Sequence, residues 1–190
     1  MERLIRITSL LNYIRAGKPS YNEIAQHLAL DTLSGYSVST IFLVTVRNDG
    51  YIDTFGKYGC SDEAFKMIPR RHVTFDAPVN RSLRTRSIVE CGNSEDYFFT
   101  SSGDNNLLFP NGFEYSLASP IPNVGSLVMY CSKVRVLSVV DEEFLVVIGG
   151  ILSLELIGVR RFDLSKDRPR GVTSLNHLES TSYETSRLPK

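Results

Sequence analysis

The stretch Ser116 to Tyr130, SLASPIPNVGSLVMY, decides the fold. Two apolar runs, Tyr115 to Pro122 and Gly125 to Cys131, lie on either side of the turn residues Pro122-Asn123-Val124-Gly125. Short apolar runs separated by proline, asparagine and glycine are typical of two antiparallel strands joined by a tight turn. This segment therefore predicts a β-hairpin.

A capped helix is predicted directly after this hairpin. Ser138 is a favourable N-cap residue, and the acidic residues that start at Asp141 suit the positive end of a helix dipole. The apolar residues that follow continue to about Gly158, where we expect the helix to end. Arg160 and Arg161 come next and suit the negative end of the dipole.

The residues before this hairpin predict a second hairpin and several short elements. Ser39 to Val46 is β-branched and apolar, Asp49-Gly50 is a strong hairpin turn, and Tyr51 to Phe55 returns, with Gly56 and Gly59 marking its end. The other expected elements are helices from Ser61 to Met67 and from Val79 to Thr85, and a strand from Ile88 to Cys91.

Two helices are predicted at the N-terminus. The first carries a broad apolar stripe and ends at Gly17-Lys18-Pro19. The second runs from about Tyr21 to Leu30 and starts with a capping box formed by Ser20 and Glu23.

This order of elements predicts an α/β (α+β) fold. Hairpins imply an antiparallel sheet, and helices at both ends of the chain must cover one of its faces. Short helices and loops between the strands would cover the other face. We therefore expect a three-layer α/β/α sandwich around a central antiparallel sheet of five or six strands.

The same residues resemble a known family. The stretch Ser116 to Tyr130, followed by the helix lead-in Val136 to Asp141, is similar to the C-terminal half of a GAF domain. The Asp-Gly hairpin and the Gly56, Tyr58 and Gly59 set fit the N-terminal half, so the resemblance covers roughly Glu23 to Gly158. It points to GAF domains of bacterial transcriptional regulators with a LuxR-type helix-turn-helix module.

The resemblance implies a GAF-like three-layer fold with a small-molecule pocket on one face of the sheet. Most aromatic residues fall in the middle of the chain, and an apolar cavity with a few polar groups is the usual chemistry of a ligand site. The alternative is that these aromatics simply fill the core. The candidate ligand-binding residues are Tyr51, Phe55, Tyr58, Phe65, His72, Phe75, Arg81, Arg84, Phe98 and Tyr115, the arginines and the histidine as partners for an anion.

The two terminal helices also suggest a homodimer. The last predicted helix is apolar on two sides, and two adjacent glycines, Gly149 and Gly150, would allow close helix–helix approach. The alternative is that the helices pack only within one chain. The expected interface residues are Leu4, Ile7, Leu11, Leu145, Gly149, Leu152 and Leu156.

Three sections of the chain are predicted from these patterns. Residues 1–19 would form a dimerisation helix, and residues 20–161 a GAF-like sensory domain. Residues 162–190 are rich in serine, threonine, lysine, arginine and proline, and would be a polar linker to an output domain absent from this chain.

Composition excludes several classes of protein. The 190 residues carry 21 basic and 21 acidic side chains, a balance that disfavours a free-standing nucleic-acid binder. The three cysteines show no CxxC spacing, so neither a metal site nor a disulfide framework is expected, and the default compartment is the cytoplasm. No signal peptide, membrane segment or cofactor is predicted.

The sequence therefore predicts a sensory, ligand-binding domain of a bacterial transcriptional regulator that acts as a dimer. DNA contact would come only through a C-terminal module absent here. The alternatives are a ligand-free dimerisation or interaction module and, third, a cysteine-dependent enzyme of GAF type. The cysteine pattern of the methionine-sulfoxide-reducing GAF enzymes is missing, as are the Cys-His pair of bilin-binding photoreceptors and the Asn-Lys-Phe-Asp-Glu set of cyclic-nucleotide phosphodiesterases. The expectation is accordingly that the chain is not an enzyme.

Overall fold

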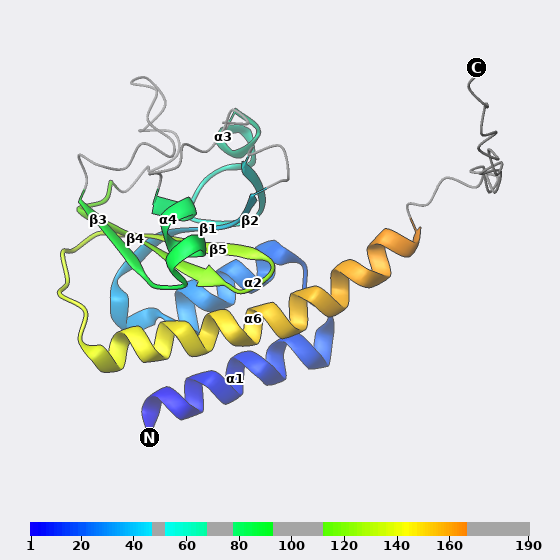
Figure 1. The fold of residues 1–190 in the computed structure, drawn as a ribbon, viewed down its shortest axis with the longest axis horizontal. Helices are drawn as coiled ribbons and strands as arrows, with labels where there is room; N and C mark the ends of the chain where they lie inside the picture. Colours follow the sequence, from blue (N-terminus) through cyan, green and yellow to red (C-terminus); the bar gives the residue numbers. More distant parts are fainter. Residues whose placement is uncertain (47–51, 68–77, 93–111, 167–190) are drawn as a thin grey trace, which may run out of the picture.

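The computed structural model describes residues 1–46, 52–67, 78–92 and 112–166 (Figure 1). Along these residues the order is two helices, two helical turns, two strands, two helices, three strands and a last helix. In chain order they are α1 (Glu2–Gly17), α2 (Tyr21–His27), the π-helical turn η1 (Leu28–Thr32), the 3-10 turn η2 (Ser34–Tyr36), β1 (Val38–Val46), β2 (Ile52–Tyr58), α3 (Asp62–Met67), α4 (Pro78–Thr85), β3 (Val89–Gly92), β4 (Tyr115–Ile121), β5 (Gly125–Cys131) and α6 (Val139–Lys166).

The described strands form one antiparallel sheet in the order β2-β1-β5-β4-β3. The predicted 115–131 hairpin is present as β4 and β5, which pair from Tyr115 opposite Cys131 to Ile121 opposite Gly125. Every residue of these two strands is buried, because both faces of the sheet are covered. The expected fold class is confirmed.

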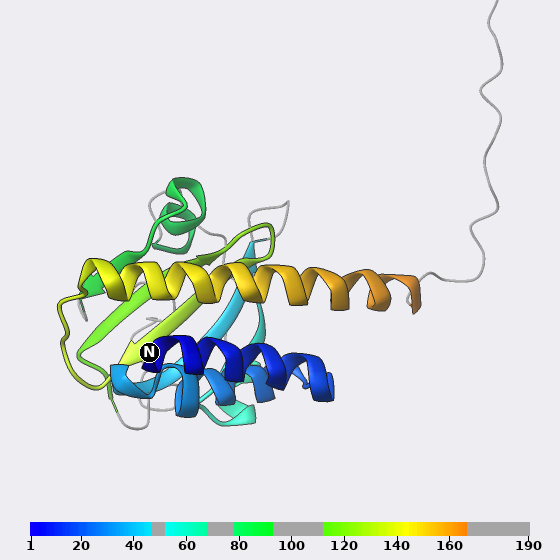
Figure 2. The same cartoon turned by 90° about the horizontal axis from the view of Figure 1, so that it is seen from below.

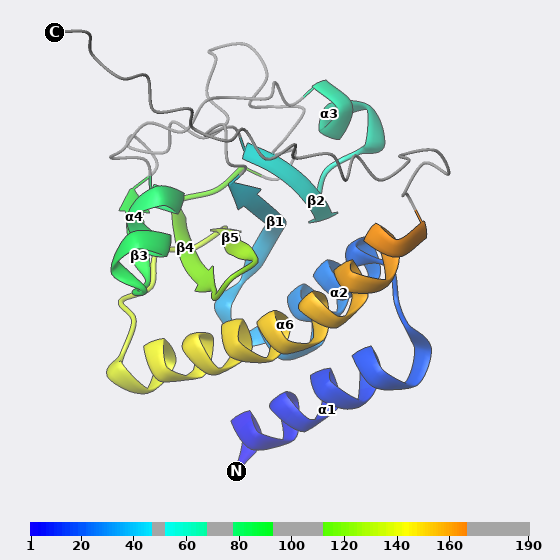
Figure 3. The ribbon, with the colours of Figure 1, turned by 45° about the vertical axis from the view of Figure 1, so that its right-hand side comes forward.

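Helices α1, α2 and α6 cover one face of the sheet, and α3 and α4 lie on the other (Figure 3). The main core fills the space beneath the long helices and is called the helix-side core here. It includes Leu10, Ile24, Ile41, Leu127 and Leu152. A smaller apolar cluster under α4, the α4-side cluster, is formed by Phe42, Val44, Val79, Ala118, Val128 and Tyr130.

Helices α1 and α6 lie side by side and run parallel (Figure 2). Arg3 pairs with Asp141 near their starts, and Arg15 pairs with Glu155 twelve residues further along α1. The last turns of α6 project beyond the sheet (Figure 1).

Both predicted helix caps are present. Ser20 Oγ accepts a hydrogen bond from the Glu23 backbone N–H, and the Glu23 carboxylate accepts one from the Ser20 N–H. Ser138 and Asp141 form the same reciprocal pair at the start of α6.

Three predicted boundaries are wrong. Strand β2 continues through Gly56 to Tyr58, because a side chain at position 56 would lie 2.8 Å from the Tyr21 carbonyl oxygen and glycine permits that close approach. The second helix does not stay α-helical to Leu30 but ends at His27 and continues as the π-helical turn η1. Helix α6 continues past Gly158 to Lys166, since the intervening sequence contains no proline.

Candidate functional site

The alternation of side chains along β1 separates the two faces of the sheet. Ile41 and Leu43 point into the helix-side core, whereas Phe42 and Val44 point into the α4-side cluster. The helix-side core is filled by long helices. The α4 face is covered by two short helices among the described residues, and it carries its own cluster of aromatic and buried polar groups.

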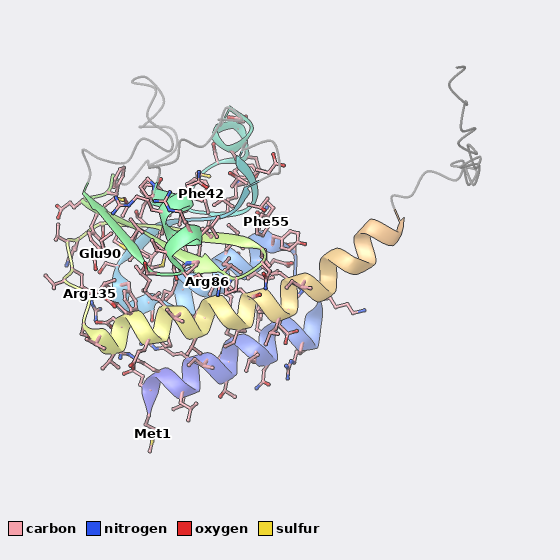
Figure 4. All side chains as sticks on the ribbon, viewed as in Figure 1. Met1, Phe42, Phe55, Arg86, Glu90 and Arg135 are labelled. Carbon is pink, nitrogen blue, oxygen red and sulfur yellow. The ribbon has the colours of Figure 1, made fainter. Side chains whose placement is uncertain are left out.

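An aromatic wall lies at the centre of the α4 face. The Phe65 ring stacks on the Phe42 ring with centroids 6.5 Å apart, and Tyr130 meets Phe42 edge-on at 6.0 Å. Phe113 packs edge-on against Tyr130 at 4.8 Å. Phe42 itself is fully buried (Figure 4). These rings come from β1, α3, β5 and the residues before β4, so the wall depends on the complete sheet.

Lys57 and Ser82 are two of the polar residues buried at this face. Lys57 lies directly opposite Phe42 in the β1–β2 pair, which places both side chains on the same face. Its side chain is 9% exposed. Ser82, one turn after Val79 on the inner side of α4, is fully buried, and its hydroxyl has no hydrogen-bond partner among the described residues.

The predicted ligand-binding residues divide between different parts of the fold. Of the described ones, Phe65 joins the α4-side cluster. Three aromatics pack instead on the helix-side core, and Arg81 and Arg84 are exposed on α4. The three aromatics are Phe55, Tyr58 and Tyr115. Tyr51, His72, Phe75 and Phe98 lie outside the described residues.

A change of register in β2 explains the position of Phe55. Leu43 pairs with Gly56 and Val44 with Thr54, so Phe55 is the extra residue of a bulge. Its ring packs edge-on against Tyr21 of α2, with centroids 5.0 Å apart. The structure therefore does not bring Phe55 and Phe65 together.

The predicted dimer residues also divide. Leu145, Gly149, Leu152 and Leu156 are buried under α6 inside the chain, and Ile7 and Leu11 pack partly against the same core. Leu4 is 67% exposed. Gly149 approaches the sheet and not another helix, because a side chain there would lie 2.2 Å from the Pro120 carbonyl oxygen.

Cys60 and Cys91 lie at opposite edges of the sheet. Cys60 follows β2, and Cys91 lies in β3. These two edge strands are separated by four strand spacings, a distance of about 19 Å. Cys131 points into the helix-side core, where burial raises the pKa of its thiol to about 12. Cys60 is the partly exposed one, and its thiol packs against the α4-side cluster. A disulfide, which needs Cα atoms within about 7 Å, does not fit this arrangement.

Among the described residues, no His, Cys, Asp or Glu side chains gather in threes as a metal ion would require. Within the same residues, no helix has the length and apolar character needed to cross a membrane.

Comparison with known proteins reveals structural relatives only. No family model matches the sequence, and no curated protein does. A GAF domain of a phosphoenolpyruvate-protein phosphotransferase from Coxiella burnetii superposes with a TM-score of 0.67 at 12% identity, covering 86% of this chain and 98% of that one. The chain has the GAF fold. The phycocyanobilin-bound GAF domain of a cyanobacterial phytochrome gives a TM-score of 0.54 at 14% identity, covering 88% of this chain and 99% of that one.

One comparison corrects the expectation that the chain is not an enzyme. A free methionine-R-sulfoxide reductase from Neisseria meningitidis, solved in complex with its substrate, has the same GAF fold with a TM-score of 0.60 at 9% identity. The superposition covers 84% of this chain and 91% of the reductase chain. The GAF fold is therefore shared by enzymes and by sensory domains, and the reasoning from family to absence of catalysis was wrong.

Proposed function

We propose that this chain is a sensory, ligand-binding GAF domain of a bacterial transcriptional regulator, located in the cytoplasm and working as a dimer. A small-molecule effector would bind at the α4 face of the sheet. DNA would be contacted by a separate module joined after α6.

The burial of Lys57 and Ser82 beside an aromatic wall carries this proposal. A polar group that loses water without gaining a full set of partners costs free energy, and a bound ligand is one way to supply the missing partner. The phytochrome GAF domain and the reductase, each solved with a small molecule bound, are consistent with such a use of the fold.

Native mass spectrometry of the full 190-residue chain tests the proposal. We expect an assembly of two 21.3 kDa chains that carries an additional small-molecule mass, which is lost on denaturation. Filling the α4 face with Ser82→Leu should remove the additional mass, whereas the exposed substitution Lys133→Leu, after β5, should keep it. A bare dimer that gains no mass from any metabolite mixture contradicts ligand sensing and supports an interaction module.

An exposed apolar stripe on α6 supports the dimer. Val140, Val147 and Leu154 are exposed and recur every seven residues, the repeat of a coiled-coil seam. Leu4 and Ile5 of α1 are exposed as well. The occupant we propose is a second copy of this chain, because the exposed stripe from Val140 to Leu154 runs along one side of α6 for two heptads.

Sedimentation velocity tests the dimer. Leu154→Glu should convert a micromolar dimer into a monomer, because the charge would be buried in the seam. Val136→Glu is the matched control, since Val136 is also exposed but precedes α6. A wild-type monomer, or a Leu154→Glu dimer, would count against this interface.

A cysteine-dependent reaction remains the other candidate, because Cys60 packs against the α4-side cluster and is partly exposed. A turnover assay with free methionine sulfoxide, comparing wild type with Cys60→Ser, tests it. Loss of a measured activity in the variant would favour catalysis over sensing.

A further inference from the structure

Lys57 occupies an unusual position for a lysine. Its ammonium Nζ lies 2.7 Å from Asp62 Oδ1 and donates a hydrogen bond of 3.0 Å to the Cys60 carbonyl. It also lies 5.4 Å from the centre of the Phe65 ring. The β2 strand, the loop after it and the first turns of α3 thus converge on one buried positive charge.

Stability alone does not account for this ammonium. Lysine is rarely buried, and replacing a buried ion pair with apolar residues is often neutral or stabilising. The partner Asp62 is 82% exposed, so water screens its charge and weakens the pair. The positive charge is therefore held toward the α4-side cluster by a carboxylate that lies on the solvent side.

The ammonium can donate one more hydrogen bond. Lysine carries three N–H donors, and its oxygen acceptors among the described residues are the Cys60 carbonyl and the Asp62 carboxylate. The ring of Phe65 offers a face and no lone pair. An additional oxygen acceptor from a bound molecule would complete the set of hydrogen bonds.

The surroundings select the class of molecule. The ring of Phe65 is partly exposed and favours a flat apolar body, since aromatic groups pair with offset or edge contacts. Asp62 already contributes one negative charge beside Lys57, so a singly charged carboxylate is repelled less than a doubly charged phosphate.

We propose that Lys57 binds the carboxylate of a small aromatic acid whose ring packs against the partly exposed Phe65. This inference rests on the proposed ligand-binding function of the same face. In it, Lys57 supplies the charge that distinguishes the acid from its neutral analogues, and Asp62 competes with the ligand for the same ammonium.

Two probes of equal shape test the charge requirement. Indole-3-acetate and indole-3-acetamide differ only in the carboxylate, and the chain contains no tryptophan, so the fluorescence of the indole ring can be followed without an indole background from the protein. We expect the wild-type chain to bind the acid at least about tenfold more tightly than the amide, the effect of one hydrogen bond to a charged group.

Three variants locate the charge. Lys57→Met should reduce acid affinity to that of the amide and leave amide affinity unchanged, while Lys133→Met, at an exposed lysine after β5, should change neither. Asp62→Asn should tighten acid binding several-fold by removing the competing carboxylate. Because Asp62 is exposed, this variant and the wild-type acid-to-amide ratio decide the question even if Lys57→Met fails to fold.

Equal affinity for acid and amide, an acid preference that survives in Lys57→Met, or weaker acid binding in Asp62→Asn would each overturn the inference. Failure of the wild type to bind either probe would also overturn it. Native mass spectra then distinguish failure of this inference from failure of the proposed function. A neutral co-purified molecule would contradict the role of Lys57 but preserve ligand sensing, whereas the absence of any ligand would contradict both.

Discussion

Arg3 and Asp141 form an ion pair with 2.6 Å between Nη2 and Oδ1, although 138 residues separate them in the chain. Arg3 belongs to α1 and Asp141 to the first turn of α6. The same carboxylate accepts hydrogen bonds from the Tyr36 hydroxyl at 2.9 Å and from Arg135 at 3.1 Å. Asp141 therefore connects α1, η2 and the β5–α6 loop to the start of the longest helix.

Asp141→Asn should destabilise the fold by about 2–4 kcal/mol, because it leaves two arginines without their buried counter-charge. Urea denaturation of the full chain measures this change. Glu2→Gln, which removes the exposed partner of Arg6, is the control and should cost less than about 0.5 kcal/mol. Equal effects of the two substitutions would contradict the role of Asp141 as the connecting group.

The same carboxylate predicts a dependence of stability on pH. Burial raises the pKa of Asp141, but hydrogen bonds from Ser138 and Tyr36 and the Arg135 charge outweigh it and lower the pKa from 3.8 to about 2. Stability from a lowered pKa is complete above the unfolded value and is lost as pH falls from about 4 through 2. When unfolding is measured from pH 7 to pH 2, the difference in free energy of unfolding between wild type and Asp141→Asn should shrink as the pH falls from about 4 to 2. A constant gap would show that the ionised form is not the one stabilised.

Gly149→Ala and Gly150→Ala should have opposite effects. A side chain at 149 would lie 2.2 Å from the Pro120 carbonyl oxygen, so alanine forces α6 off the sheet and should cost about 1–3 kcal/mol. At Gly150 nothing lies within 4 Å, and alanine should stabilise the helix by up to about 1 kcal/mol. Thermal unfolding of the two variants provides the comparison. Stabilisation by both changes would show that helix propensity, and not contact with β4, governs both positions.

Two buried serines should respond differently to alanine. Ser126 Oγ donates a 2.9 Å hydrogen bond to the Ser119 carbonyl, so Ser126→Ala should destabilise the chain by about 1 kcal/mol. Ser82 has no partner among the described residues, so Ser82→Ala should leave the free protein equally or more stable and weaken ligand binding. Chemical denaturation with and without the co-purified molecule distinguishes these cases. A loss of stability in ligand-free Ser82→Ala would mean that its hydroxyl is already satisfied.

Local signals made most of the fold predictable. The Ser20–Glu23 and Ser138–Asp141 caps and the turn at Pro122 to Gly125 are decided within a few residues of sequence, and the structure contains all three. The continuation of β2 through Gly56 was not predictable in the same way. It depends on the close approach of Tyr21, which is distant in sequence.

The site was harder to predict than the fold. Phe55 lies in a strand and Phe65 in a short helix, and neither local pattern shows which face of the sheet the side chain meets, so the two could not be assigned to opposite sides. Lys57 was missed because it lies between two glycines that indicated the end of a strand. The available signal was a lysine flanked by Phe55 and Tyr58, a charge within an aromatic segment. Apart from Ser138, the partners of Asp141 lie 6 to 138 residues away, and no local motif reveals them.

The contact between Gly149 and Pro120 has a mechanical consequence. Backbone meets backbone there, with no side chain between α6 and β4 to absorb a displacement. On its opposite face β4 carries Ala118, which belongs to the α4-side cluster. A molecule that pushed this strand outward would thus shift α6 as a rigid rod, and the small movement would be magnified at Lys166, the far end of the rod.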